Sequence, residues 1–187
     1  DAYEGGNAWW GDYDNDGDQD MYLVLANYAT ANKLLRNDGG TFADVTANPI
    51  RGLEHDGKAG WLDANNDGNL DLYLVNNNER NHLYLGNGSG SFTDDTNTLL
   101  IWENYMTCFT WGDCDNDGDI DPYITVYVST NSNTLVRNES TGSNHWLQVR
   151  LVGNTSNRFG VGARIRLVTS GGEQTREVRA DLHEHTL

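Results

Sequence analysis

The chain is poor in cysteine, proline and basic residues, and it has no long apolar run. Its 187 residues include 2 Cys, 2 Pro and 12 Lys or Arg against 28 Asp or Glu, a formal net charge of -16. Without a basic stripe to neutralise phosphates, nucleic acid is excluded as a partner. No apolar run approaches the roughly 18 residues of a membrane span, so we expect no span. Because the chain opens at Asp1, without Met or a signal peptide, we expect a processed chain or a piece of a longer one.

The chain does have three copies of one acidic loop, which start at residues 12, 63 and 113. Their sequences are DYDNDGDQD, DANNDGNLD and DCDNDGDID. Oxygen-bearing side chains at positions 1, 3, 5 and 9 can converge on one hard cation. The glycine at position 6 lets the backbone turn, so that the position 7 carbonyl points inward. Since crowded acids repel one another unless a cation is present, the loops predict three Ca²⁺ sites.

We predict five calcium ligands in each loop, of which position 7 contributes its backbone carbonyl. The predicted ligands are Asp12, Asp14, Asp16, Asp18 and Asp20 in loop one, Asp63, Asn65, Asp67, Asn69 and Asp71 in loop two, and Asp113, Asp115, Asp117, Asp119 and Asp121 in loop three. Loop two has an amide at position 3 and no acid at position 7, so we expect it to bind most weakly. Extracellular calcium at millimolar levels saturates such sites, which favours a structural role.

Other cation sites fit these loops less well. An EF-hand needs a bidentate Glu at position 12, where the chain has Leu23, Leu74 and Ile124. Magnesium is the weaker candidate because it prefers octahedral geometry and keeps its waters. Zinc lacks its preferred ligands. His183 and His185 could hold a metal from alternate strand positions, but a frayed chain end is the favoured interpretation.

The repeat extends beyond the loops. Each loop has a Trp two residues before it, at Trp10, Trp61 and Trp111, and a strand-like run rich in β-branched and aromatic residues after it. Only 99–106 is ambiguous between strand and helix. Four short antiparallel strands at a period near 50 residues are typical of propeller blades, so we predict an all-β fold of three four-stranded blades. Three blades cannot close an ordinary ring, so other segments or protomers must cover the open sheet edges.

The motifs resemble those of a known family. Trp-Gly-Asp-x-Asp-Asn-Asp-Gly-Asp-x-Asp leads into an apolar strand, then Asn-x-Leu-x-Arg-Asn and Gly-x-Phe-x-Asp-x-Thr, as in the FG-GAP/VCBS repeat family. The resemblance covers residues 7–140. It implies a domain of three calcium-binding repeats in residues 1–140, with the repeats at about 7–57, 58–107 and 108–140.

Residues 141–187 change character and predict three alternating strands with arginines on one face. This part resembles the ASPIC/UnbV module, which follows FG-GAP/VCBS repeats in secreted proteins that include the cartilage acidic protein group. The module looks truncated, because its usual final strand is not recognisable at 181–187. The arginines could contact acidic glycans or the acidic repeats, although ordinary solvated strand faces are the favoured interpretation. They are Arg150, Arg164, Arg166, Arg176 and Arg179.

No catalytic constellation stands out. The chain has no G-x-S-x-G elbow, no evident Cys/His pairing and no acid/base pair apart from the loops. Gly160-Val-Gly-Ala is better interpreted as a turn between strands than as a dinucleotide fingerprint. We therefore expect that the protein is not an enzyme.

Two covalent features stay open. Cys108 and Cys114 lie six residues apart and allow either a disulfide or a small buried Cys108 with Cys114 in a loop position. Three N-x-[ST] sequons permit glycosylation in a compartment that supports it. They stand at Asn87, Asn138 and Asn154.

Two functions follow from these patterns. The first is a non-enzymatic, secreted, calcium-binding β-repeat protein in adhesion or extracellular assembly, which associates with itself or another protein through open sheet edges into oligomers or a filament. The alternative is a fragment of a larger propeller that binds, or less favourably cleaves, polysaccharide. In that case aromatic residues such as Trp102 and Tyr105 would stack on the sugars.

Overall fold

The structure is a computed structural model that describes residues 6–25, 30–51, 56–76, 81–95, 106–126, 133–139, 145–155, 157–170 and 172–178. Within these ranges the chain forms β-strands and no helix, and every strand pairing is antiparallel. The all-β prediction is confirmed. No helix in the described part of the chain is long and apolar enough to cross a membrane. The segment 99–105 and the histidines at 183 and 185 lie outside the described residues.

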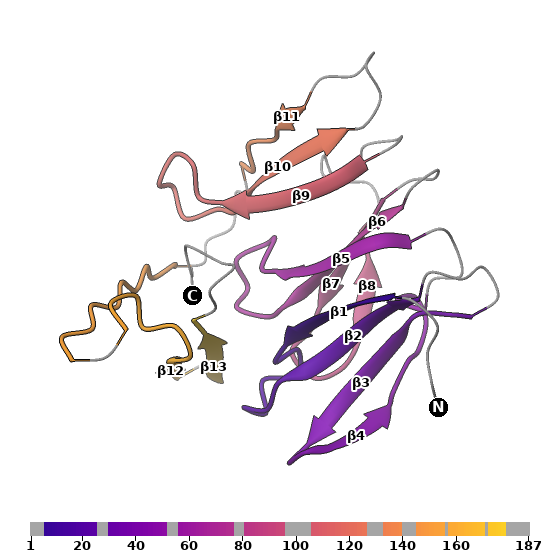
Figure 1. The fold of residues 1–187 in the computed structure, drawn as a ribbon, viewed down its shortest axis with the longest axis horizontal. Coiled ribbons are helices and arrows are strands. Elements are labelled where there is room, and N and C mark those ends of the chain that lie inside the picture. The colour runs from indigo at the N-terminus through magenta and orange to yellow at the C-terminus, as the bar shows by residue number, and fades with distance from the viewer. Residues whose placement is uncertain are drawn as a thin grey trace.

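Each repeat forms its own sheet (Figure 1), and the strands within a sheet follow chain order. Sheet one contains β1 (Gly6–Gly11), β2 (Asp20–Leu25), β3 (Lys33–Asp38) and β4 (Thr41–Asp44). Sheet two contains β5 (Asp56–Leu62), β6 (Asp71–Asn76), β7 (His82–Gly86) and β8 (Phe92–Asp94). Sheet three contains β9 (Met106–Gly112), β10 (Asp121–Val126) and β11 (Thr134–Leu135).

Sheet three differs from the predicted four-stranded blade, because its described part has three strands. The first two repeats return to the sheet through a glycine turn and a Phe-containing strand, β4 or β8. After β11 the third repeat has no such Gly-x-Phe sequence. The chain therefore lacks the signal for a fourth strand at this point.

The three acidic loops connect the first and second strands of their sheets. The last pair before each loop is Gly11 with Asp20, Leu62 with Asp71, and Gly112 with Asp121. Because the three hairpins have the same register at this end, all three loops lie at one end of the stacked sheets (Figure 1).

The core lies between sheets. The side chains of a strand alternate between its two faces. We call the face towards the next sheet along the chain the forward face, and the opposite one the rear face. Tyr22 and Val24 on the forward face of sheet one are buried with Leu72 and Leu74 on the rear face of sheet two. On the forward face of sheet two, Tyr73 and its neighbours are buried against Ile124 of sheet three in the same way.

The C-terminal part forms one hairpin, from β12 (Arg164–Thr169) and β13 (Gly172–Glu177). It lies beside the acidic loops (Figure 1). The strand expected near residue 150 is reduced to an isolated bridge at Gln148 within the described residues 145–155, where Leu147 and Val152 are exposed. Alternating apolar side chains form a strand only where a neighbouring strand can pair with the backbone.

Candidate metal centres

The three loops share one backbone conformation. The asparagine at position 4 is in the left-handed region in each, with φ of 59° at Asn15, 55° at Asn66 and 63° at Asn116. The glycine at position 6 has φ of 95°, 87° and 94° in the three loops. Gly and Asn adopt this region more readily than most residues. The backbone conformation of the loop therefore explains why position 4 is Asn and position 6 is Gly in every copy.

The Asp at position 9 ties each loop to its sheet. In loop two, Asp71 Oδ2 accepts from the Ala64 N–H at 2.8 Å and Oδ1 from the Gly86 N–H at 2.8 Å. Asp20 and Asp121 accept the equivalent pairs of backbone bonds in loops one and three. All three carboxylates are buried. They therefore fasten the loop start to a neighbouring strand whether or not they also hold a cation.

Position 1 closes the turn. Its Oδ2 accepts from the N–H of the position 6 glycine, at 3.1 Å for Asp12, 2.9 Å for Asp63 and 3.1 Å for Asp113. In loop one the other oxygen, Asp12 Oδ1, is buried and accepts no hydrogen bond, and the same is true of Asp14 Oδ1. A buried carboxylate oxygen without a donor is costly unless a cation satisfies it.

Loop one and loop three each bring three acids together. One carboxylate oxygen from each of Asp12, Asp14 and Asp20 lies within 4.8 Å of the other two. In loop three the corresponding trio is Asp113, Asp115 and Asp117. Asp16 is exposed and lies outside the first trio, and Asp121 lies outside the second. The structure therefore gathers part of the predicted ligand set in loops one and three.

Loops two and three carry internal competitors for a cation. Position 3 of loop two is Asn65, whose Nδ2 donates to Asp67 Oδ2 at 3.2 Å. In loop three, Arg137 Nε lies 2.5 Å from Asp115 Oδ2 and so forms an ion pair with one predicted ligand. The position 7 side chain of loop one is bonded elsewhere: Asp18 Oδ2 accepts from the Gly39 N–H at 2.8 Å. The role of the position 7 backbone carbonyl stays a prediction.

A polar ladder links successive loops. Asn15 Nδ2 donates to Asn69 Oδ1 at 3.1 Å, and Asn66 Nδ2 donates to Asp119 Oδ1 at 2.5 Å. In both cases position 4 of one loop reaches position 7 of the next. The sequence did hold a signal for this ladder, because position 4 is Asn in all three copies.

Burial raises the pKa of four acids in loops one and two. It raises the pKa of Asp71 to about 8 and that of Asp20 to about 7, although two backbone N–H donors oppose the shift in each case. Burial also raises the pKa of Asp12 and of Asp63 to about 6. Without a cation these loops therefore hold negative charge at a free-energy cost.

Two arginines of the C-terminal hairpin contact the loop glycines. Arg164 is exposed and Arg176 is half-buried, so the interpretation of a solvated face is wrong only for Arg176. Arg164 pairs with Glu177 and Arg176 pairs with Ile165, so the two arginines lie on opposite faces and not on one face as predicted. Arg164 Nη1 donates to the Gly17 carbonyl at 2.8 Å, and Arg176 Nη2 donates to the Gly68 carbonyl at 3.2 Å. Burial lowers the pKa of Arg176, whereas nearby carboxylates such as Asp63 raise it. Arg166 instead pairs with Glu173. Contact with the acidic repeats was the alternative that the sequence left open.

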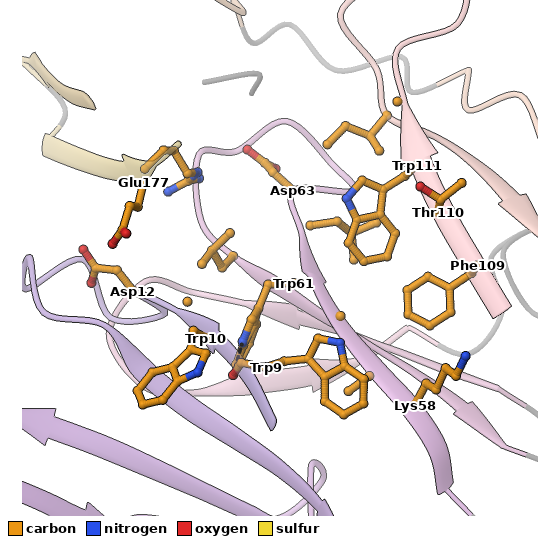
Figure 2. A pocket seen from close by; sticks show the side chains of 18 of the residues that line it. Trp9, Trp10, Asp12, Lys58, Trp61, Asp63, Phe109, Thr110, Trp111 and Glu177 are labelled. Atoms are coloured by element: carbon orange, nitrogen blue, oxygen red, sulfur yellow. Dashed lines mark hydrogen bonds between the residues drawn. The ribbon is translucent and has the colours of Figure 1, made fainter. Parts of the chain in front are cut away.

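A cavity of about 340 Å³ lies beside the loops, between the first strands of the three sheets (Figure 2). Aromatic side chains line much of it, and charged groups stand at its ends. The lining includes Trp9, Trp10, Trp61, Phe109, Trp111, Lys58, Asp12, Asp63, Arg176 and Glu177. The predicted sugar-stacking residues Trp102 and Tyr105 lie outside the described residues. The sequence did not single out this cavity, because three repeats that are far apart in the chain form it.

Cys108 and Cys114 are both free and exposed, so the disulfide is absent and Cys108 is not buried. Of the three sequons, Asn87 and Asn154 are exposed. Asn138 is half-buried, and its Nδ2 donates to the Ala64 carbonyl at 3.0 Å. A glycan on this nitrogen would disturb that contact between sheets, so the first two asparagines are the better acceptors.

The family model of the FG-GAP-like repeat matches the chain twice, at residues 12–74 and 63–124. Each match begins at the first Asp of one loop and ends in the strand that follows the next loop, so each matched segment contains two loops and strands from two successive sheets. The two matches together cover more than half of the chain. A search of curated proteins found no match. The chain is therefore a member of the FG-GAP-like repeat family.

Proposed function

We propose that this chain is a non-enzymatic, secreted, calcium-binding β-repeat protein that acts in adhesion or extracellular assembly. One observation carries the proposal. Three loops with the same left-handed positions bring acids together at one end of the sheets, and loop one holds two buried carboxylate oxygens that accept no hydrogen bond. Such an arrangement is stable when a cation supplies the missing positive charge.

The donor set favours calcium over other cations. Every predicted side-chain ligand is a carboxylate or an amide, and hard oxygen ligands suit Ca²⁺. Zinc prefers nitrogen and sulfur ligands, and magnesium keeps most of its waters. Asp12, Asp14 and Asp20 would hold the ion in loop one, and Asp113, Asp115 and Asp117 would hold it in loop three. In loop two, Asp63 and Asp67 would act with Asn65.

A bound cation would serve the fold. It would remove repulsion within each loop and fix the loop backbone, which the ladder connects to the next loop and the position 9 Asp connects to the sheet. We infer that residues 141–187 form a separate ASPIC/UnbV-like module. The contacts of Arg164 and Arg176 with the loops support a module that works together with the repeats. The boundary near residue 140 stays a prediction.

Isothermal titration of calcium into chelator-stripped protein tests the calcium-binding part of this proposal. We expect three sites with Kd on the order of 10⁻⁴ to 10⁻³ M, with the weakest in loop two. Asp14→Asn should weaken the loop-one site to about the affinity of loop two, because it removes a carboxylate of the loop-one trio and leaves the amide that loop two has at Asn65. Asp38→Asn is the control, since Asp38 is an exposed acid outside the predicted ligands. Absence of binding, or equal binding of magnesium, would refute the proposal.

The cavity favours glycan binding as a second candidate function. Aromatic faces flanked by charged groups can stack on sugars and hydrogen-bond to hydroxyls. If the cavity takes a glycan, soluble acidic and neutral oligosaccharides should change the tryptophan fluorescence of the calcium-loaded protein. Trp9→Ala should weaken binding by roughly tenfold or more, whereas Phe159→Ala, at an exposed site outside the cavity, should not. An unchanged affinity in Trp9→Ala would exclude this cavity as the site.

A further inference from the structure

The two outer faces of the three-sheet stack expose side chains whose equivalents in the other repeats are buried between sheets. One position on the forward face is a tyrosine in all three sheets. Its side chain is 0% exposed at Tyr22 and 2% exposed at Tyr73, but 39% exposed at Tyr123 of sheet three. A second forward-face position is a leucine in all three sheets. It is buried at Leu34 and Leu83 but exposed at Leu135. The forward face of sheet three thus repeats the surface that sheets one and two bury against a neighbour.

The rear face of sheet one shows the complementary pattern. Trp10 is 41% exposed, whereas the equivalent Trp61 of sheet two is 9% exposed because sheet one covers it. Phe42 of sheet one is 42% exposed and contacts Trp10 edge-on, with ring centroids 6.0 Å apart. Trp61 and Phe92 form the matching pair in sheet two, at 6.1 Å. The rear face of sheet one therefore carries the same aromatic platform as the rear face of sheet two.

The internal interface shows what such a platform receives. Tyr13, at position 2 of loop one, stacks on Trp61 at 6.2 Å and on Phe92 at 5.9 Å. Position 2 is also buried in loop two, at Ala64, but it is exposed in loop three, at Cys114. The third sheet therefore presents an uncovered position 2 beside its uncovered Tyr123.

The polar ladder ends in the same way. Position 4 donates to position 7 of the following loop from Asn15 and from Asn66. The third member, Asn116, is exposed, and Asp18 is the position 7 residue that begins the series. The apolar contacts and the polar ladder thus both end at sheet three. A sheet one placed against it would offer the groups that extend both.

We propose that the rear face of sheet one and the forward face of sheet three are the two halves of one interface, through which two copies of this chain close into a ring of six sheets. The proposal rests on the assembly function above and names its partner as a second copy. Each copy has one of each face, so the contact joins unlike faces and occurs twice around a twofold axis. Six blades fall within the four to eight at which propellers close.

The interface should be weaker than the internal ones. Thr125 replaces Val24 and Val75 on the forward face of sheet three, and Gln19 replaces Leu70 on the rear face of sheet one. Each copy also carries a formal charge of -16, and bound calcium would reduce their mutual repulsion. We expect a reversible dimer with Kd in the micromolar range, about 10⁻⁶ M, in millimolar calcium.

Light scattering of the calcium-loaded protein over a concentration series tests the proposal. We expect a mass twice the 20.8 kDa of the chain at high concentration. Trp10→Asp and Tyr123→Asp should each weaken association on the order of 100-fold, because each places a charge in the apolar contact. Phe159→Asp is the control, since Phe159 is exposed outside both faces. Calcium stoichiometry and melting temperature identify any variant that is misfolded.

Mixing the two interface variants gives the sharpest result. The unaltered forward face of Trp10→Asp can meet the unaltered rear face of Tyr123→Asp, whereas the second contact of such a pair carries both changes. The mixture should therefore form open dimers through one unaltered contact, which neither variant can form alone. A dimer through like faces would instead survive one of the single changes, and a filament would grow without limit; either result overturns the ring. A wild-type monomer that still binds three calcium ions refutes this interface but leaves the proposed function intact. A dimer that binds no calcium would refute the proposed function but leave this interface intact.

Discussion

Removal of calcium at pH 8 is expected to lower the midpoint of thermal unfolding by about 8–16 °C. At free calcium ten times its Kd, each site stabilises the fold by about 1.4 kcal/mol, and three sites together by about 4 kcal/mol. For a chain of this length, 1 kcal/mol corresponds to roughly 2–4 °C. Differential scanning calorimetry with calcium and with excess chelator measures the difference. A shift of the same size on adding only magnesium to stripped protein would contradict calcium as the specific ligand.

The size of this shift should depend on pH. The pKa of Asp71 is raised to about 8 and that of Asp20 to about 7, both above the ordinary value of 3.8. The cation-free folded state therefore binds more protons than the unfolded state, and its stability decreases as the pH rises from about 4 to 8. Calcium needs the deprotonated acids, so its contribution increases over the same range. Chelation at pH 5 should thus change the midpoint much less than at pH 8.

The same pH series provides its own check. In chelator alone, the midpoint should fall as the pH is raised from 5 to 8, whereas in millimolar calcium it should stay nearly level. If the chelated protein became more stable over this interval, the loop acids would not be the groups that control its stability.

Replacement of Asp71 by Ala should lower the free energy of unfolding by about 3–5 kcal/mol. Asp71 is fully buried, and its two oxygens accept from the backbone N–H groups of Ala64 and Gly86. The change leaves both donors buried without an acceptor and detaches loop two from β7. Urea unfolding in millimolar calcium, followed by tryptophan fluorescence, gives the value.

Two further variants separate the hydrogen bonds of Asp71 from its charge. Asp71→Asn keeps one acceptor oxygen, so its loss of stability should be intermediate. Asp38→Ala removes an exposed acid that pairs with Arg36, and it should cost less than about 1 kcal/mol. An equal loss in Asp38→Ala and Asp71→Ala would show that position 9 has no special role in the loop.

Much of the fold could be read from short segments. The apolar run after each loop predicts β2, β6 and β10, and the glycine turns predict β4 and β8. These elements formed because their sequences fit a pleated, half-buried surface and because their turns contain the residues that the turns require. The predictions failed where a segment does not pair over its length. The alternating run near residue 150 makes only an isolated bridge, at Gln148, and the described part of the third repeat has no return strand.

The candidate site divides in the same way. The acids, the left-handed Asn at position 4 and the left-handed Gly at position 6 all fall within nine residues, so loop geometry follows from local spacing. The arginine contacts do not follow from local spacing, since Arg164 lies 147 residues from Gly17 and Arg176 lies 108 residues from Gly68 in the sequence. An alternating strand alone does not show which surface its arginines will meet.

By itself the sequence determined the all-β class, the family and the conformation of each acidic loop, because these depend on side chains within one turn or one hairpin. Only the tertiary structure decided which faces are buried. It placed Tyr13 on Trp61 and Phe92, joined the three loops by a ladder of asparagines, and left Tyr123 and Trp10 exposed. The same residue type stands at Tyr22, Tyr73 and Tyr123, and at Trp10 and Trp61, so the different burial within each set comes from whether another sheet lies against it.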